Sequence, residues 1–339
     1  MKEQDFVLEV KDLKTTFKVG RRQVHAVNGV TFSLERGKTL CIVGESGCGK
    51  SVTAHSIMQL LPPNGILENG SVTYYPQSGE KGKIISNFSR TGREIRAIRG
   101  KDIAMIFQDP MSTLNPVYTI GSQIMESLSS HEKIDKAEAK ARIIKLLSDL
   151  GIPTPEKRYD QYPHEFSGGM KQRVMIAIAM ICKPNILIAD EPTTALDVTI
   201  QAQILDLMQK MQREHGTSII LITHNMGIVA EVADSVAVMY MGRVVEYGTL
   251  EQIFTNPLHP YTKALMQSVP VLGMDKTQEL ETIEGNTPDA STDFGGCEFS
   301  DRCECAVAAC KNHFPVDTIM DDGHRVRCLL FEEVRVGGK

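Results

Sequence analysis

Short apolar runs bounded by turn residues recur along this chain, and they predict strands that are buried on both faces of a sheet. The clearest runs are 38–43, 186–191 and 218–222. The first run is followed by a helical stretch, 51–61, which ends at two prolines. Buried strands that alternate with helices are typical of an α/β protein with a parallel core sheet, so we expect this fold class.

A second pattern, in which apolar and polar positions alternate, predicts an antiparallel β subdomain. The alternation is clearest at 7–10 and 30–34, and we assign 71–75 and 103–107 to the same subdomain. The polar stretch 77–93 contains scattered glycines, which predict an exposed insertion.

A helical insert is predicted at about 112–165. Asp135, with Glu138 three residues later, is a typical helix start, and Gly151 is a typical helix end. Four apolar residues line one face between them, which we interpret as core packing; they are Ile143, Leu146, Leu147 and Leu150.

The segment from Gly44 to Ser51 fits the phosphate-binding loop pattern G-x-x-x-x-G-K-[ST] at every required position. It lies between a predicted strand and a predicted helix, so its backbone N–H groups and the helix N-terminus can face a polyphosphate. In such a loop, Lys50 reaches the β- and γ-phosphates and Ser51 holds Mg²⁺. The residues expected to contact the nucleotide here are Gly44, Ser46, Gly47, Cys48, Gly49, Lys50, Ser51 and Val52.

Two carboxylates, Asp190 and Glu191, end the second apolar run. We expect Asp190 to join the Mg²⁺ shell and Glu191 to polarise a water toward the γ-phosphate. Phosphoryl transfer needs positioned charge and an oriented nucleophile, and the two groups supply both. An acidic pair alone would also suit a solvated turn.

Further motifs make the chain resemble the ATP-binding subunits of ABC transporters. The segment from Phe166 to Arg173 resembles the signature motif of that family, with Met170 where glutamine is commoner. The family's other short motifs are also present, and all of the motifs occur along the chain in the family's order. These other motifs are Phe107-Gln108-Asp109-Pro110 (Q-loop), Ala195-Leu196-Asp197 (D-loop) and Thr223-His224 (switch histidine). The resemblance implies a P-loop NTPase fold and an ATPase that uses ATP and Mg²⁺.

The resemblance also implies roles for single residues. Gln108 would contact Mg²⁺ and the attacking water, while His224 would contact the γ-phosphate and hold Glu191. A head-to-tail dimer is implied, in which the signature motif of one subunit caps the ATP bound by the other. The residues that take part in this cap are Ser167, Gly168, Gly169 and Asp197.

Phe17 is the expected platform for the adenine base. The family stacks the base on an aromatic residue upstream of the phosphate loop, and an aromatic ring offers a π-face to any base. Packing of Phe17 into the core from an edge strand is an alternative, and Val24 or His25 could contribute instead.

The C-terminal part narrows the resemblance to the oligopeptide/dipeptide importer branch. The segments that carry it are 256–265, 283–288, 296–303 and 323–328. We therefore expect two regions, an ABC ATPase nucleotide-binding domain at 1–255 and a peptide-importer-type extension with a Cys-rich tail at 256–339. The branch implies a subunit that hydrolyses ATP to power peptide uptake.

The expected partners are a second, homologous ATPase subunit in a heterodimer, two transmembrane permeases and, indirectly, an extracytoplasmic solute-binding protein. An importer of nickel, glutathione or an opine is the alternative within the family. A soluble ABC ATPase of DNA repair or translation is the alternative outside transport, but those proteins typically carry a long coiled coil or two ATPase domains.

Net charge and hydropathy agree with this assignment. The formal net charge of −5 gives no case for general nucleic-acid binding. The first residues are charged, with no apolar stretch typical of a signal peptide, and no run is long enough for a membrane span. We expect a location on the cytoplasmic side of the cell membrane, with attachment through the partners.

Five of the eight cysteines lie between Cys297 and Cys328. In a cytosolic chain such a group favours a metal or cluster over disulfides. We predict that Cys297, Cys303, Cys310 and Cys328 hold a [4Fe-4S] cluster, as in some members of the branch. Tetrahedral zinc and reduced, packed cysteines are the alternatives, and Cys305 departs from the branch's pattern.

Overall fold

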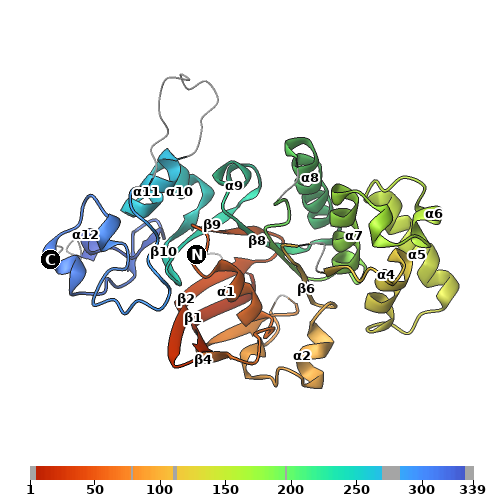
Figure 1. The fold of residues 1–339 in the computed structure, drawn as a ribbon, viewed down its shortest axis with the longest axis horizontal. Coiled ribbons are helices and arrows are strands. Elements are labelled where there is room, and N and C mark those ends of the chain that lie inside the picture. Colours follow the sequence, from red (N-terminus) through yellow and green to blue (C-terminus); the bar gives the residue numbers. More distant parts are fainter. Residues whose placement is uncertain (1–4, 78, 110–112, 195–196, 269–282, 333–339) are drawn as a thin grey trace.

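The computed structural model describes residues 5–77, 79–109, 113–194, 197–268 and 283–332. Two sheets form its centre, a larger one that carries most of the helices and a smaller antiparallel one below it in Figure 1. The α/β fold class is confirmed. Parts of the predicted motifs and regions lie outside the described residues: Pro110, residue 112, Ala195, Leu196, and the segments 269–282 and 333–339 of the predicted extension.

The larger sheet has the strand order β11-β12-β10-β9-β3-β8-β7-β6. Its five strands from β9 to β6 are parallel, and the other pairs are antiparallel. The bounds are β3 Thr39–Val43, β6 Ile103–Ile106, β7 Ile186–Asp190, β8 Ser218–Thr223, β9 Ser235–Tyr240, β10 Arg243–Thr249, β11 Thr318–Ile319 and β12 Arg325–Val326. All residues of β3, β7 and β8 are buried, as their apolar runs predict.

The smaller sheet has the order β2-β1-β4-β5 and is antiparallel throughout. Its strands are β1 Phe6–Val19, β2 Arg22–Glu35, β4 Gly65–Tyr74 and β5 Lys83–Ile84. The assignment of 103–107 to this subdomain was wrong, because β6 pairs in parallel with β7 in the larger sheet. Its buried residues suit a position between two layers of the core, and the pattern alone did not identify the partner strand.

Most of the helices lie against the larger sheet or beyond its β6 edge, whereas α2 lies below β6 and α12 at the opposite end of the molecule (Figure 1). The α-helices are α1 Lys50–Ile57, α2 Arg93–Ile98, α4 Ile120–Ser129, α5 Lys136–Asp149, α6 Pro155–Tyr159, α7 Gly168–Met180, α8 Val198–His215, α9 Met226–Val232, α10 Leu250–Thr255, α11 Pro260–Gln267 and α12 Leu329–Glu332. Short 3₁₀ turns are η1 Ile85–Asn87, η2 Pro163–Glu165, η3 Ser300–Arg302 and η4 Ala308–Lys311.

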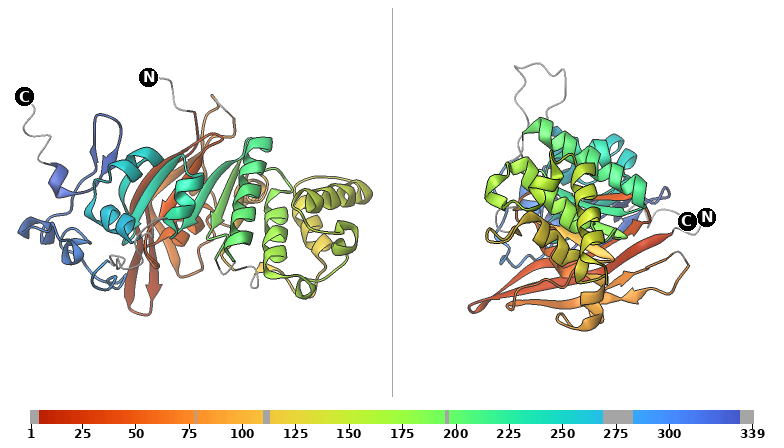
Figure 2. Two further views of the ribbon diagram at one scale, coloured as in Figure 1. Left: turned by 90° about the horizontal axis from the view of Figure 1, so that it is seen from above. Right: turned by 90° about the vertical axis from the view of Figure 1, so that its right-hand side faces the viewer.

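The helical insert consists of α4, α5 and α6 and lies at the opposite end of the molecule from α12 (Figure 2). Asp135 caps α5 by accepting the Ala137 N–H at 2.8 Å, as its sequence predicts. Ile143 and Leu147 are fully buried, which confirms the apolar face. Gly151 follows the helix with a φ of 69°, a left-handed conformation that favours glycine.

The stretch 77–93 is only partly the exposed insertion that its polarity predicts. Ile85 in η1 is fully buried and packs in the core beneath the smaller sheet. Ser86 accepts the Val72 N–H through its hydroxyl, which ties this segment to β4. The three large apolar residues of this stretch, Ile84, Ile85 and Phe88, follow neither a helix nor a strand period, so the sequence did not reveal this anchor.

The C-terminal extension joins the larger sheet through β12, which pairs with Glu246 and Tyr247 of β10. The buried Glu246 carboxylate accepts the backbone N–H groups of Leu258 and His259 at 2.7 and 2.8 Å. His259 then caps α11, since its Nδ1 accepts the Tyr261 N–H at 3.0 Å. The predicted boundary at residue 255 stays a prediction.

His259 should make the protein less stable in mild acid. Burial lowers the pKa of His259 from 6.5 to about 4, so the folded protein keeps the ring neutral while the unfolded chain protonates it. The contribution of the neutral ring to the free energy of unfolding is fully present above pH 6.5. It is lost as pH falls toward 4, and the loss is about 3 kcal/mol for a pKa shift of this size. We expect the thermal midpoint of wild type to fall over this range more steeply than that of His259→Asn, whose amide can still cap α11. Parallel pH profiles for the two proteins would contradict this prediction.

Candidate active site

The phosphate-binding loop connects β3 to α1, and glycines let it lie close to neighbouring backbone. A Cβ on Gly44 would lie 2.2 Å from the Met239 carbonyl oxygen, and a Cβ on Gly49 would lie 2.3 Å from that of Ala26. Both glycines also have positive φ angles, 150° and 102°. These two positions therefore require glycine for space and for backbone conformation.

The loop fits a polyphosphate. Gly49 caps α1 without a side-chain hydrogen bond, so the first amides of the helix are left for a ligand. Gly47 has no atom within 4 Å of the position of a Cβ, so this point of the loop is open. Lys50 folds over the loop and donates from Nζ to the carbonyl oxygens of Gly44 and Glu45, each at 2.8 Å.

Two side chains with oxygen atoms of the kind that Mg²⁺ prefers, Ser51 and Asp190, lie beside the loop. The Ser51 hydroxyl donates to Oδ1 of Asp190 at 3.0 Å, which brings together two residues separated widely in sequence. Asp190 is buried at the end of β7, and burial raises the pKa of its carboxyl above the usual value. A hydroxyl and a carboxylate are ligands that suit Mg²⁺, so the pair fits the metal that the sequence predicts.

Glu191 is the centre of the second group of contacts. Its Oε2 accepts from Nε2 of Gln108 at 3.0 Å and from the Thr194 hydroxyl at 2.9 Å, and its Oε1 lies 3.1 Å from Nδ1 of His224. Its φ of 45° is a left-handed conformation, uncommon outside glycine and typical of functional sites. The structure thus brings Gln108, Glu191 and His224 together.

The charge of Glu191 is maintained by these contacts. Burial pulls the pKa of Glu191 upward, but hydrogen bonds from His224 and Thr194 outweigh it, so the pKa lies below its usual value. The carboxylate is therefore ionised at neutral pH and can accept a hydrogen bond from water. His224 is 62% exposed, so its ring can also reach a ligand above the site.

The signature residues lie on a different element from the loop. Ser167 caps α7 by accepting the Met170 N–H, and α7 begins at Gly168. A Cβ on Gly169 would lie 2.9 Å from Cγ2 of Ile200. Asp197 caps α8 by accepting the Ile200 N–H at 3.0 Å.

Phe17 is half-buried in β1, opposite Val24 of β2 and Gly65 of β4. Its ring lies 2.8 Å from the position that a Cβ on Gly65 would take. A side chain at residue 65 would therefore clash with the Phe17 ring. His25 contacts Thr16 through Nδ1 at 2.9 Å. The adenine role stays a prediction.

Two residues at the site were missed from the sequence. Thr194 holds Glu191, and its position three residues after an acid at a strand end could have indicated it. Arg302 forms an ion pair with Glu45, the second residue of the loop. No local signal indicates this pair, because its members are 257 residues apart.

Comparisons with known proteins agree with this geometry. Residues 27–194 match the family model described as ABC transporter, and residues 245–310 match the one described as oligopeptide/dipeptide transporter, C-terminal region. The dipeptide transport ATP-binding protein DppD of Bacillus subtilis is 50% identical over 328 residues, which cover 96% of this chain and 95% of that protein. This chain belongs to the ABC transporter ATPase family.

Another curated relative and a solved structure support the same family. The oligopeptide transport ATP-binding protein OppD of Bacillus subtilis is 50% identical over 325 residues, 96% of this chain and 88% of that protein. A bacterial ABC transporter cassette solved as a dimer is 25% identical, with a TM-score of 0.60, and covers 72% of this chain and 98% of its own. As an ABC ATPase, the chain uses ATP and Mg²⁺. None of the helices in its described part is long and apolar enough to cross a membrane.

The predicted iron–sulfur cluster was wrong. Within the ranges that the structure describes, no three His, Cys, Asp or Glu side chains gather in a group that could hold a metal, and the relatives are named only as ATP-binding proteins. The cysteines do border one small cavity, but Cys297 and Cys303 pack against the main core and Cys328 against Leu258 and Val326. Burial raises the pKa of Cys297 to about 12 and of Cys328 to about 11, which favours neutral thiols. Cysteine count and spacing did not reveal this packing, and the zinc alternative fails on the same geometry.

Proposed function

We propose that this chain is the ATP-hydrolysing subunit of a membrane importer that takes up peptides. The observation that carries the proposal is the 50% identity to the dipeptide transport protein, which extends over 96% of the chain and so includes the extension. A match to the C-terminal region of oligopeptide/dipeptide transporters supports the same assignment. ATP hydrolysis itself follows from the family.

We infer the following roles for the site residues. Lys50 and the amides of the loop hold the phosphates of ATP, while Ser51, Asp190 and Gln108 hold Mg²⁺. When bound, Mg²⁺ neutralises charge on the β- and γ-phosphates. Glu191 orients the attacking water and accepts its proton, and His224 keeps Glu191 in position. Phe17 stacks on the adenine.

Two copies of the ATPase fold complete the site. A helix N-terminus such as that of α7, with Ser167, Gly168 and Gly169, suits a phosphate. In this chain, however, α7 packs against β6, which lies three strands away from β3 in the sheet. We therefore infer a head-to-tail dimer in which these residues and Asp197 meet the partner's ATP. The dimeric cassette among the structural neighbours supports this arrangement.

The partner is a second, homologous ATPase subunit, and the pair attaches to two permeases on the cytoplasmic side of the membrane. A solute-binding protein delivers the peptide from outside. The exposed side chains of Val117 and Tyr118, which precede α4 in the helical insert, suit contact with a permease. Closure of the dimer on ATP and its reopening after hydrolysis would move the permeases.

A comparison of solutes tests the proposal. We expect the complex of this subunit with the permeases encoded beside it to hydrolyse ATP faster when peptide and the cognate solute-binding protein are added. Nickel, glutathione and an opine, each tested with the same binding protein, serve as matched controls. Stimulation by one of these and not by peptides would assign the importer to that solute. An ATPase that co-purifies with no permease would favour a role outside transport.

A further inference from the structure

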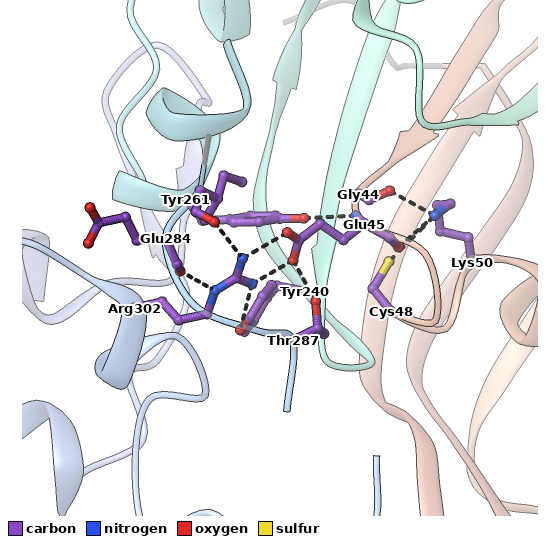
Figure 3. Close-up of polar contacts among 10 residues, drawn as sticks. Gly44, Glu45, Cys48, Lys50, Tyr240, Tyr261, Glu284, Thr287 and Arg302 are labelled. Carbon is purple, nitrogen blue, oxygen red and sulfur yellow. Dashed lines mark hydrogen bonds and ion pairs between the residues drawn. The ribbon is translucent and has the colours of Figure 1, made fainter. Parts of the chain in front are cut away.

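Three segments of the C-terminal extension meet the phosphate-binding loop at one residue, Glu45 (Figure 3). The Tyr261 hydroxyl on α11 accepts the Glu45 N–H at 2.8 Å. The Thr287 hydroxyl donates to the Glu45 carboxylate at 3.1 Å. Arg302, at the end of η3, donates from Nη1 and Nη2 to the two carboxylate oxygens at 2.7 and 2.9 Å. Glu45 is thus held through both its backbone and its side chain.

The Arg302 guanidinium is buried and fully hydrogen-bonded. Its side chain is 6% exposed, and its remaining bonds go to the carbonyl oxygens of Glu284 at 3.0 Å and Ile283 at 3.4 Å and to the Tyr240 hydroxyl at 3.4 Å. It also lies 5.9 Å from the ring centroid of Tyr240. A bidentate pair in such surroundings fixes both partners in one geometry, which an exposed pair does not.

Glu45 in turn holds the interior of the loop. Its carbonyl oxygen accepts from Nζ of Lys50 at 2.8 Å and from the Cys48 N–H at 3.3 Å. A displacement of Glu45 would therefore move acceptors on which Lys50 and the turn of the loop depend. We call the three residues of the extension that hold Glu45, namely Tyr261, Thr287 and Arg302, the clamp. The clamp contacts Glu45 from the side of the extension, whereas Gly47 is open to a ligand.

The clamp also controls charge beside the loop. Burial by itself would raise the pKa of Glu45, but Arg302, Thr287 and Lys50 outweigh it, so the pKa lies below its usual value and the carboxylate is ionised. If Arg302 were removed, a half-buried negative charge would lose its main partner next to a site for a polyphosphate. Both geometry and charge would then disfavour ATP.

We propose that Arg302 is a positioning residue for ATP binding, through which the C-terminal extension holds the phosphate-binding loop by Glu45. The inference rests on the proposed function only in that this loop binds ATP. The inference gives the extension a part in nucleotide binding, although the extension contains none of the ATP-binding motifs.

The test is the affinity of the purified full chain for a fluorescent ATP analogue with Mg²⁺. We expect Arg302→Ala to raise Kd about tenfold, or about 1.4 kcal/mol. The substitution removes both the bidentate hydrogen bonds to Glu45 and the positive charge that balances its carboxylate. Arg302→Lys keeps the charge but not the fork, so we expect a smaller rise, about threefold. Lys311→Ala is the matched control, since it removes an exposed pair with Asp301 in the same extension and should leave Kd unchanged.

A second set of variants separates positioning from stability. In the Glu45→Ala background, Arg302→Ala should cause no further loss of affinity, because both act through one contact. In the assembled transporter, Arg302→Ala should raise KM for ATP but leave kcat within about twofold of wild type, since Glu191 is untouched.

An Arg302→Ala protein with a lowered thermal midpoint but an unchanged Kd would overturn the inference, as would an equal loss of affinity in both backgrounds. Wild-type protein that fails to bind the analogue would overturn the nucleotide assignment of the loop as well. The two failures are therefore distinguishable.

Discussion

Glu191→Gln is expected to lower ATP turnover by about two to four orders of magnitude, because it keeps the shape of the side chain but removes the proton acceptor. Gln108, Thr194 and His224 lie around this carboxylate. ATP should still bind, since Lys50 and the loop are unchanged. The measurement is ATP hydrolysis by the assembled transporter with the equivalent acid of the partner subunit also changed, so that no intact second site remains.

Glu214→Gln is the matched control for this experiment. Glu214 lies near the end of α8 in an exposed pair with Lys210, so the same chemical change there should leave turnover at the wild-type rate. If Glu191→Gln also hydrolyses ATP at the wild-type rate, the role assigned to Glu191 is wrong.

Gly169→Asp is expected to abolish ATP-dependent closure of the dimer and, with it, most turnover. The substitution brings a negative charge to the N-terminus of α7, where the proposed dimer places the partner's γ-phosphate. Binding of ATP to the isolated subunit should be unchanged, because Gly169 is in α7 and the phosphate-binding loop connects β3 to α1. Closure can be followed by cross-linking between subunits with and without ATP.

Gly169→Asn separates charge from bulk. A Cβ at this position already presses on Ile200, so both variants carry the same steric cost, and only Gly169→Asp adds charge. We expect Gly169→Asn to retain more closure than Gly169→Asp. Normal closure in Gly169→Asp would contradict the assignment of the signature residues to the partner's ATP.

Local pattern predicted the elements that position the site. The apolar runs of β3, β7 and β8 are each buried throughout, because a strand covered on both faces needs apolar side chains at every position. Parallel neighbours align their carboxyl ends, so Ser51, Asp190 and His224 gather at one edge of the sheet. The contacts of Ser51 with Asp190 and of His224 with Glu191 follow from that alignment.

Contacts between distant segments were not predictable from the same pattern. The apolar run at 103–107 could not indicate whether β6 pairs with the smaller or the larger sheet, since strand pairing depends on segments far away. The pair of Arg302 with Glu45 has no local signature, because an arginine in a polar turn is usually a solvated residue. Likewise, cysteine spacing did not reveal that Cys297 and Cys303 pack against the main core.

The most direct test of the account is uptake of a labelled peptide into proteoliposomes that contain this subunit, its ATPase partner and both permeases. ATP is enclosed on the side that carries the ATPase subunits, and peptide with the solute-binding protein is supplied on the other side. The account predicts that peptide accumulates only with hydrolysable ATP and that Glu191→Gln, introduced together with the equivalent change in the partner, stops the accumulation. Peptide uptake that continues in this double variant, or without ATP, would contradict it.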